Sequence, residues 1–366
     1  MQYIPQMEPW FGSEEKIAMS NYMEEGGWLT EFKQTNEFEK RIAEYTGSKH
    51  CFVVNNGTIS LTLMAIAAGI KYGDEVIVPN YTMVATPNSI KMIGAIPVFV
   101  DVEAETLCMD LDLARAAITD KTKAIIFVNA NGRNPKSGFE AFVELCKEKN
   151  LILLEDSAQS LGSLYSNGKH QGTMSLAGSF SFSAPKIIST GQGGAIITNN
   201  DEFAYKISRL KDFGRSSGGN DVHDSIGFNF KFTEMQAVIG NAQMIKLPWR
   251  VERKKEIYSL YLKQLSDISQ IKFFMQDLNF TTPWFIDVLV ENREKLQAYL
   301  KENNIGTRIM YPPINKQLAY NLTGEYLVSN YVGKNGLWLP SASQLTNEQI
   351  IYVCEIIREF YTNNKN

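Results

Sequence analysis

The stretch GSFSFSAPKIISTGQGGAIITNN, residues 178–200, decides the fold and carries the first candidate for chemistry. Phe180 and Phe182 alternate with serines, which is the pattern of a half-buried strand. Pro185 cannot donate to a strand ladder, so we expect Lys186 on the turn that follows the strand. Burial among apolar residues disfavours the ammonium form and lowers the pKa of a lysine, which makes its amine a nucleophile for carbonyl groups. A surface lysine on a hairpin is the alternative for this stretch alone.

A second stretch, LILLEDSAQSLGS at residues 151–163, favours the chemical interpretation of Lys186. Its first four residues predict a buried strand, and Glu155 and Asp156 follow at the carboxyl end, where ligand groups gather in α/β sheets. A lysine that forms a Schiff base, together with an aspartate that pairs with a ring nitrogen, is the signature of pyridoxal phosphate (PLP). The fixed anion keeps that nitrogen protonated by raising its pKa. An ordinary strand-end turn is the alternative for the two carboxylates.

Five motifs resemble, in order, those of the DegT/DnrJ/EryC1/StrS sugar aminotransferases: NNGTISL, EDSAQSLGS, GSFSFSAPK, TGQGGAIITNN and GFNFKFTEMQAVIGNAQ. The resemblance covers residues 11–361, and within the family it is greatest to the GDP-perosamine synthase branch. It implies an α/β protein with the fold of a fold-type I PLP-dependent transferase, similar to aspartate aminotransferase. Such a fold has a large domain with a seven-stranded, mostly parallel sheet and a smaller α+β C-terminal domain.

The predicted elements agree with that architecture. Strands and helices alternate, which is typical of a mostly parallel sheet covered on both faces. Strands are expected at 51–54, 75–78, 98–102, 124–128, 151–154, 178–183 and 195–198, and helices at 37–45, 59–68, 86–93, 113–118, 139–149 and 201–211. Pro248 predicts a break between helices at 233–245 and 251–265, and hence a large domain 1–247 with an N-terminal arm and a small domain 248–366. Within the small domain we expect a strand at 284–290 and helices at 296–302 and from Thr346 onward.

Composition narrows the class of protein. Of 366 residues, 44% are hydrophobic and 21% charged, as in ordinary globular proteins, and the net charge of −4 gives no basis for binding nucleic acid or a membrane surface. Neither a signal peptide nor a long apolar run is visible, so we expect a cytoplasmic protein without a membrane partner. Four scattered cysteines and three histidines form no ligand pattern, and we expect no metal site.

The phosphate of PLP has candidate ligands on several segments. A strand, a turn containing Gly57 and Thr58, and a helix would point free backbone N–H groups at an anion, although a plain helix cap is the alternative. The resemblance implies that Gly57 and Thr58 bind the cofactor phosphate, joined by Ser183. It also implies that Asn229, at the end of a glycine-rich loop, contacts the phosphate in the neighbouring subunit, and therefore that the protein is a homodimer with shared active sites.

The cofactor ring has three further candidates. The resemblance implies that Gln159 hydrogen-bonds its phenolic oxygen. Met83 stands where the family generally has an aromatic residue that stacks on the ring. A methionine sulfur is polarisable enough to lie over a ring face, and Tyr81 is the alternative for this position.

Substrate-binding candidates are three. Arg133 lies in VNANGRNPKSG, where many family members have a histidine-containing loop, and its guanidinium suits a phosphate or carboxylate; an exposed loop arginine is the alternative. Arg308 and Tyr311, in GTRIMYPP, stand in the family's substrate-binding segment. Arg308 is suited to a bidentate grip on an anion, with a structural salt bridge as the alternative.

The resemblance implies a PLP-dependent aminotransferase with Lys186 and Asp156 as its catalytic residues. L-glutamate would donate the amino group, and the acceptor would be a keto group of a nucleotide-linked keto-deoxysugar, for surface polysaccharide or related glycan biosynthesis. One alternative is a small acceptor, such as a phosphorylated triose or a cyclitol ketone, because the family pattern is broken at Met83 and Arg133. Another is a PLP-binding regulator without turnover, which the intact Lys186 and Asp156 disfavour.

Overall fold

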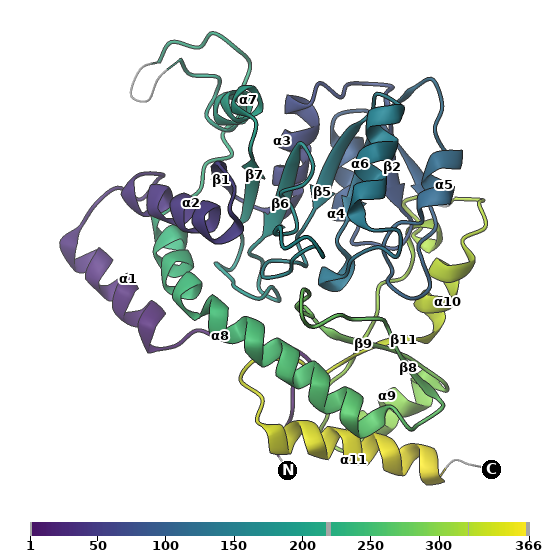
Figure 1. Ribbon diagram of the computed structural model, residues 1–366. Coiled ribbons are helices and arrows are strands. Elements are labelled where there is room, and N and C mark those ends of the chain that lie inside the picture. The colour runs from purple at the N-terminus through teal and green to yellow at the C-terminus, as the bar shows by residue number, and fades with distance from the viewer. Residues whose placement is uncertain (1, 217–220, 321, 364–366) are drawn as a thin grey trace.

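The computed structural model describes residues 2–216, 221–320 and 322–363, and within these the larger part of the chain is built on a seven-stranded sheet (Figure 1). The strand order is β1-β7-β6-β5-β4-β2-β3. The chain of parallel pairs runs from β6 through β5, β4 and β2 to β3, whereas β7 is antiparallel to both of its neighbours. The strands are β1 (His50–Val54), β2 (Glu75–Pro79), β3 (Ile96–Val100), β4 (Thr122–Val128), β5 (Ile152–Asp156), β6 (Ala177–Ser181) and β7 (Gly194–Thr198). The predicted seven-stranded, mostly parallel sheet is confirmed.

Alternating side chains of each strand cover the two faces of this sheet. In β4, Ile125 and Phe127 pack against α6 on one face, with the Phe127 and Phe142 rings 4.8 Å apart, while Ala124 and Ile126 pack against α3 on the other. Strand side chains alternate between faces, so a run that is apolar throughout is buried on both. The helices of this part are α1 (Ser13–Glu25), α2 (Lys33–Thr46), α3 (Gly57–Ala67), α4 (Ala85–Met92), α5 (Leu111–Ala116), α6 (Phe139–Glu148) and α7 (Asp201–Lys211).

A single long helix, α8 (Glu234–Leu265), runs beneath both parts of the molecule from α2 to α11 (Figure 1). The predicted helix break at Pro248 is therefore wrong. Proline leaves the carbonyl of Met244 without its helical N–H partner, at a cost of about 3 kcal/mol. The apolar face nevertheless continues across the proline, because Met244, Leu247 and Val251 belong to one buried cluster and each buried side chain contributes about 1.5–3 kcal/mol. The division into domains at 247/248 stays a prediction.

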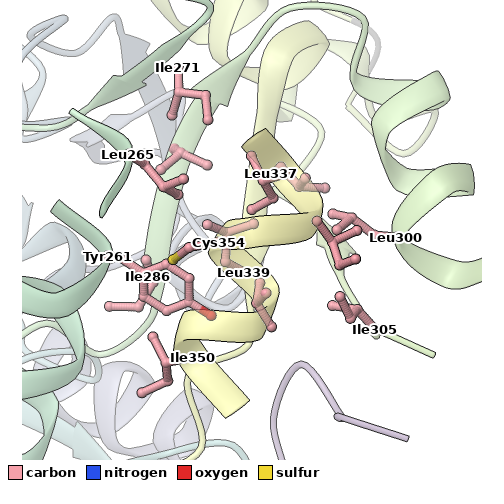
Figure 2. Packing of buried hydrophobic residues seen from close by; sticks show 14 of the residues in the cluster. Tyr261, Leu265, Ile271, Ile286, Leu300, Ile305, Leu337, Leu339, Ile350 and Cys354 are labelled. Atoms are coloured by element: carbon pink, nitrogen blue, oxygen red, sulfur yellow. The ribbon is translucent and has the colours of Figure 1, made fainter. Parts of the chain in front are cut away.

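The smaller part has, in the described residues, a four-stranded antiparallel sheet in the order β10-β11-β9-β8. Its strands are β8 (Ile271–Phe273), β9 (Ile286–Val290), β10 (Arg308–Ile309) and β11 (Gly336–Leu339), and its helices are α9 (Arg293–Glu302), α10 (Leu327–Asn335) and α11 (Asn347–Asn363). Figure 2 shows its core, where side chains of α8, β9, β11 and α11 meet. The predicted cap of α11 is present: the N–H of Gln349 donates to the Thr346 hydroxyl, and the N–H of Thr346 donates to the Gln349 side chain.

No helix within the described part of the chain has both the length and the apolar character needed to span a membrane.

Candidate active site

A cavity of about 520 Å³ opens where the parallel strands of the large sheet end. The segments that follow β1, β2, β5 and β6 form its wall, and the smaller part closes it with Trp284, just before β9, and with Arg308 and Tyr311, in and just after β10. This is the edge at which α/β sheets bind ligands. The structure brings together nine of the candidates named from the sequence, namely Gly57, Thr58, Met83, Asp156, Gln159, Ser183, Lys186, Arg308 and Tyr311.

Lys186 lies in the connection between β6 and β7, as the sequence predicts. Its backbone N–H donates to the carbonyl of Ser183 at 3.0 Å, which places it in a tight turn at the cavity wall. Its ammonium nitrogen lies 4.0 Å from the centre of the Trp284 ring. Burial lowers the pKa of Lys186 to about 8, and the charge of Asp156 opposes that fall. About one tenth of this amine is therefore unprotonated and nucleophilic at pH 7, far more than for a lysine with an ordinary pKa.

Asp156 is buried at the end of β5, with each of its oxygens accepting a hydrogen bond. The hydroxyl of Thr86 donates to Oδ2 at 2.7 Å, and the N–H of Ala158 donates to Oδ1 at 3.2 Å. Burial raises the pKa of Asp156, while these bonds and the charge of Lys186 hold it down. A carboxylate oxygen accepts more than one hydrogen bond, so Asp156 keeps free lone pairs for a protonated ring nitrogen.

Thr86 belongs to the candidate site through its hydrogen bond to Asp156, and the sequence did not single it out. It stands in the first turn of α4, where it reads as an ordinary helix residue. Its oxygen lies 3.0 Å from that of Thr82, which lines the cavity. Because Thr86 donates its only hydroxyl proton to Asp156, Thr82 is the donor of this second bond. The two threonines form a chain that fixes the carboxylate.

The N-terminus of α3 faces the same cavity. The Asn56 side chain caps the helix by accepting the N–H of Ile59 at 2.9 Å. A Cβ on Gly57 would come within 2.9 Å of the Ser181 side chain, so only glycine leaves the turn open at this point. The turn and the serines opposite it form a cradle of donors suited to an anion. Ser181 was not among the sequence candidates, although it alternates with Ser183 in the same motif.

Gln159 has a defined orientation. The backbone N–H of Asn131 donates to its Oε1 at 2.8 Å, so the amide oxygen is engaged and the NH₂ group is left as the donor. A donor is what the oxygen of a phenolate requires. Asn131 is itself fixed, because its side chain both donates to and accepts from the backbone of Phe285, at 2.9 and 2.8 Å.

The structure favours Met83 over Tyr81 as the residue beside a cofactor ring. Met83 lines the cavity and is 46% exposed. Tyr81 is buried and borders a separate cavity of about 20 Å³ behind the Gln159 side chain.

Arg133 lies outside the main cavity, and the alternative of an exposed loop arginine is wrong. The side chain is 1% exposed and forms an ion pair with Asp287 of β9. Its guanidinium carbon lies 4.9 Å from the centre of the Phe274 ring. Asp287 is 154 residues away in the sequence, so no local sequence pattern predicts this ion pair. Arg133 ties the two parts of the chain together and borders a cavity of about 20 Å³ that shares Gln159 and Tyr311 with the main cavity.

We expect Asp287→Ala to lower the free energy of unfolding by about 3–5 kcal/mol, because Arg133 would stay buried without its counter-charge. The measurement is urea denaturation of the apoprotein. Asp267→Ala is the matched control, because Asp267 pairs with Arg358 at the surface and its loss should leave the urea midpoint unchanged. Equal midpoints for the two variants would mean that the buried ion pair does not stabilise the junction.

Two other candidates lie at the mouth of the cavity. Arg308 is exposed, with its guanidinium 5.4 Å from the centre of the Trp338 ring, and Tyr311 packs edge-on to the same ring at 4.7 Å. Asn229 is exposed, pairs with Asp212 through a β-bridge, and does not line the cavity of its own chain.

The DegT/DnrJ/EryC1/StrS aminotransferase family matches residues 12–358. The chain belongs to this family. It is 36% identical to GDP-perosamine synthase of Escherichia coli O157:H7, covering 99% of this chain and 100% of that one. It is 33% identical to dTDP-3-amino-3,6-dideoxy-alpha-D-galactopyranose transaminase of Aneurinibacillus thermoaerophilus, covering 93% of each chain. The structure of a putative sugar aminotransferase from Streptococcus pneumoniae, in its PLP form, matches with a TM-score of 0.92 and 26% identity over 99% of each chain.

Membership of the DegT/DnrJ/EryC1/StrS family confirms the predicted activity and cofactor: the protein is a PLP-dependent aminotransferase. The residues present fit that cofactor. The cradle at Gly57 suits its phosphate, the free lone pairs of Asp156 suit its ring nitrogen, and the Gln159 NH₂ group suits its phenolic oxygen. The Lys186 amine lies in the same cavity, as a bond to the aldehyde carbon requires.

Proposed function

We propose that this aminotransferase moves an amino group from L-glutamate to a keto group of a nucleotide-linked keto-deoxysugar, in the biosynthesis of a surface polysaccharide or related glycan. The observation that carries the proposal is the 520 Å³ cavity in which Lys186, Asp156 and the N-terminus of α3 meet, beside the exposed Arg308. The names of the relatives, GDP-perosamine synthase and a dTDP-sugar transaminase, support the class of acceptor. A cytoplasmic location is proposed with it, because nucleotide-linked sugars are made there.

Lys186 has two tasks in this proposal. Its amine would hold PLP covalently, and once released the same amine would take up and return the proton at the substrate carbon. When bound, PLP would supply the electron sink and the carrier for the amino group. A group that both accepts and returns a proton works best when its pKa lies near the working pH. The pKa of about 8 that burial gives Lys186 meets this requirement.

The other residues would orient the cofactor and favour one charge state of its ring nitrogen. Asp156, held by Thr86, would pair with the ring nitrogen, and its negative charge would favour the protonated form of that nitrogen. Gln159 donates to the phenolic oxygen. Gly57, Thr58 and Ser183 would bind the phosphate, and Met83 would be the residue beside the ring.

The proposal includes a homodimer in which Asn229 serves the partner's site. The exposure of Asn229 outside its own cavity supports this arrangement. Two apolar side chains in the same segment are also exposed, Ile226 at 82% and Phe228 at 39%, and burial against a second copy would stabilise both.

A panel of ketone acceptors with L-glutamate, read out as release of 2-oxoglutarate, tests the substrate class. The panel contains GDP-, dTDP- and UDP-linked 4-keto-6-deoxyhexoses, a phosphorylated triose and a cyclitol ketone. We expect one nucleotide-linked ketone to exceed the small ketones in kcat/KM by about 100-fold or more, because binding of the remote nucleotide lowers the barrier at the ketone.

A small ketone as the best acceptor would overturn the substrate class and leave the aminotransferase intact. The location of Arg133 outside the main cavity weakens one of the two reasons for that alternative. No amino transfer from any donor, with PLP bound, would instead point to a regulator.

A further inference from the structure

The indole ring of Trp284 covers the Lys186 amine. Trp284 is 4% exposed and lies just before β9, where the smaller part of the chain meets the turn that carries the lysine. The Lys186 nitrogen is 4.0 Å from the centre of the ring. The indole N–H donates to the carbonyl of Pro185, the neighbour of Lys186, at 2.7 Å. The ring is thus attached to the same turn whose side chain it covers.

Trp284 is also fixed from its other side. It stacks on Phe285 with ring centres 3.9 Å apart, and Trp338 packs edge-on at 5.9 Å. Its backbone carbonyl accepts a hydrogen bond from the buried Lys254 at 2.8 Å. A ring held at its face, its edge, its N–H and its backbone cannot swing away when Lys186 moves.

We propose that Trp284 is a positioning residue for Lys186, and that its π face holds the protonated amine against the cavity wall whenever the lysine is free of the cofactor. The negative face of an indole attracts an ammonium ion, and the attraction grows when water is excluded. A lysine that transfers a proton needs a defined position for its side chain while the amine is protonated. The catalytic consequence rests on the proposed function, but the attraction itself is a property of the apoprotein.

The other charged groups near Lys186 set the direction of the expected change. Asp156 favours the ammonium form. Tyr311 and the cationic Arg308 line the main cavity, and Glu8, Arg250 and Lys254 line a small cavity on the other side of the Lys186 turn. Burial, which disfavours the ammonium form, has the largest effect and brings the pKa to about 8. Removing the π face while keeping the apolar cover should therefore lower the pKa of Lys186 further.

The test follows the acylation rate of Lys186 in the apoprotein as a function of pH, with acetic anhydride as the reagent and peptide mass spectrometry as the readout. Trp284→Leu should lower the pKa by about half a unit to one unit, so acylation at neutral pH should be about three- to fivefold faster. Trp284→Phe keeps a weaker π face and should lie between Leu and Trp. Trp249→Phe, on an exposed tryptophan of α8, is the matched control and should match the unchanged protein. An unchanged or raised pKa in both Trp284 variants would overturn the proposal, because the ring would then act as an apolar cover only.

Fluorinated tryptophan provides a second test in which the ring keeps its size. Fluorine withdraws charge from the ring face, so protein made with fluorotryptophan at its five tryptophans should show a lowered Lys186 pKa. The same labelling of the Trp284→Phe variant should have no effect, which assigns the change to one ring. An equal effect in both backgrounds would contradict the proposal. If borohydride instead traps PLP on another lysine, the proposed function of Lys186 fails, while these titrations still decide the role of Trp284.

Discussion

Replacing Lys186 with alanine should abolish the covalent capture of PLP by borohydride and remove transaminase activity. In the proposed mechanism the amine is the nucleophile for the cofactor aldehyde, and it also serves as the acid and base at the substrate carbon. Loss of the proton transfer alone costs on the order of 10²–10⁴-fold in rate. The variant should still bind PLP non-covalently, because Asp156, Gln159 and the cradle at Gly57 are untouched.

Two further variants test whether covalent capture of PLP depends on the Lys186 amine itself. Lys186→Arg keeps a cation at the wall but offers no amine for the aldehyde, so it should fail in the same way as alanine. Lys254→Met removes the other buried lysine of the neighbourhood, whose pKa burial lowers to about 7, and should leave borohydride capture on Lys186. A covalent adduct that survives in Lys186→Ala, located by mass spectrometry, would assign the cofactor link to another lysine and remove the centre of the proposed mechanism.

The strands, and the positions of Lys186 and Asp156 at strand ends, were predictable because the sequence patterns that indicate them are local. Residues 151–156 read as a buried strand followed by carboxylates, and β5 carries Asp156 at its end. The alternation around Phe180 and the proline after it place Lys186 beyond β6. Since parallel strands end at one edge of the sheet, two such ends imply a shared site even without strand order.

What the sequence could not provide depends on contacts between distant segments. Thr86 donates a hydrogen bond to Asp156, which lies 70 residues away in the sequence, and Trp284 donates one to Pro185, which lies 99 residues away. Nothing in the neighbourhood of Arg133 reveals whether it faces solvent or a buried carboxylate. The helix break expected at Pro248 failed for the same reason: a local propensity was outweighed by apolar packing on both sides of the proline.

Mixing two inactive variants, Lys186→Ala and Asn229→Asp, should restore about one quarter of wild-type activity. The second change places a carboxylate against the cofactor phosphate, and like charges in a site shielded from water repel strongly. If Asn229 reaches the partner's site, a mixed dimer has one site with both lesions and one site with neither. Random exchange makes about half of the dimers mixed, and each of these has one intact site of two.

The double variant, Lys186→Ala with Asn229→Asp in one chain, is the matched control, because its mixture with wild-type protein has the same composition. Every site of a mixed dimer then carries one lesion if Asn229 acts across the interface, so about one quarter of the activity should remain, from wild-type dimers alone. If Asn229 serves its own chain, the wild-type chain stays active in any dimer. About half of the activity would then remain in this mixture, and none would return when the two single variants are mixed. A shared site therefore gives about one quarter of the activity in both mixtures, whereas a self-contained site gives none in the first and about one half in the second.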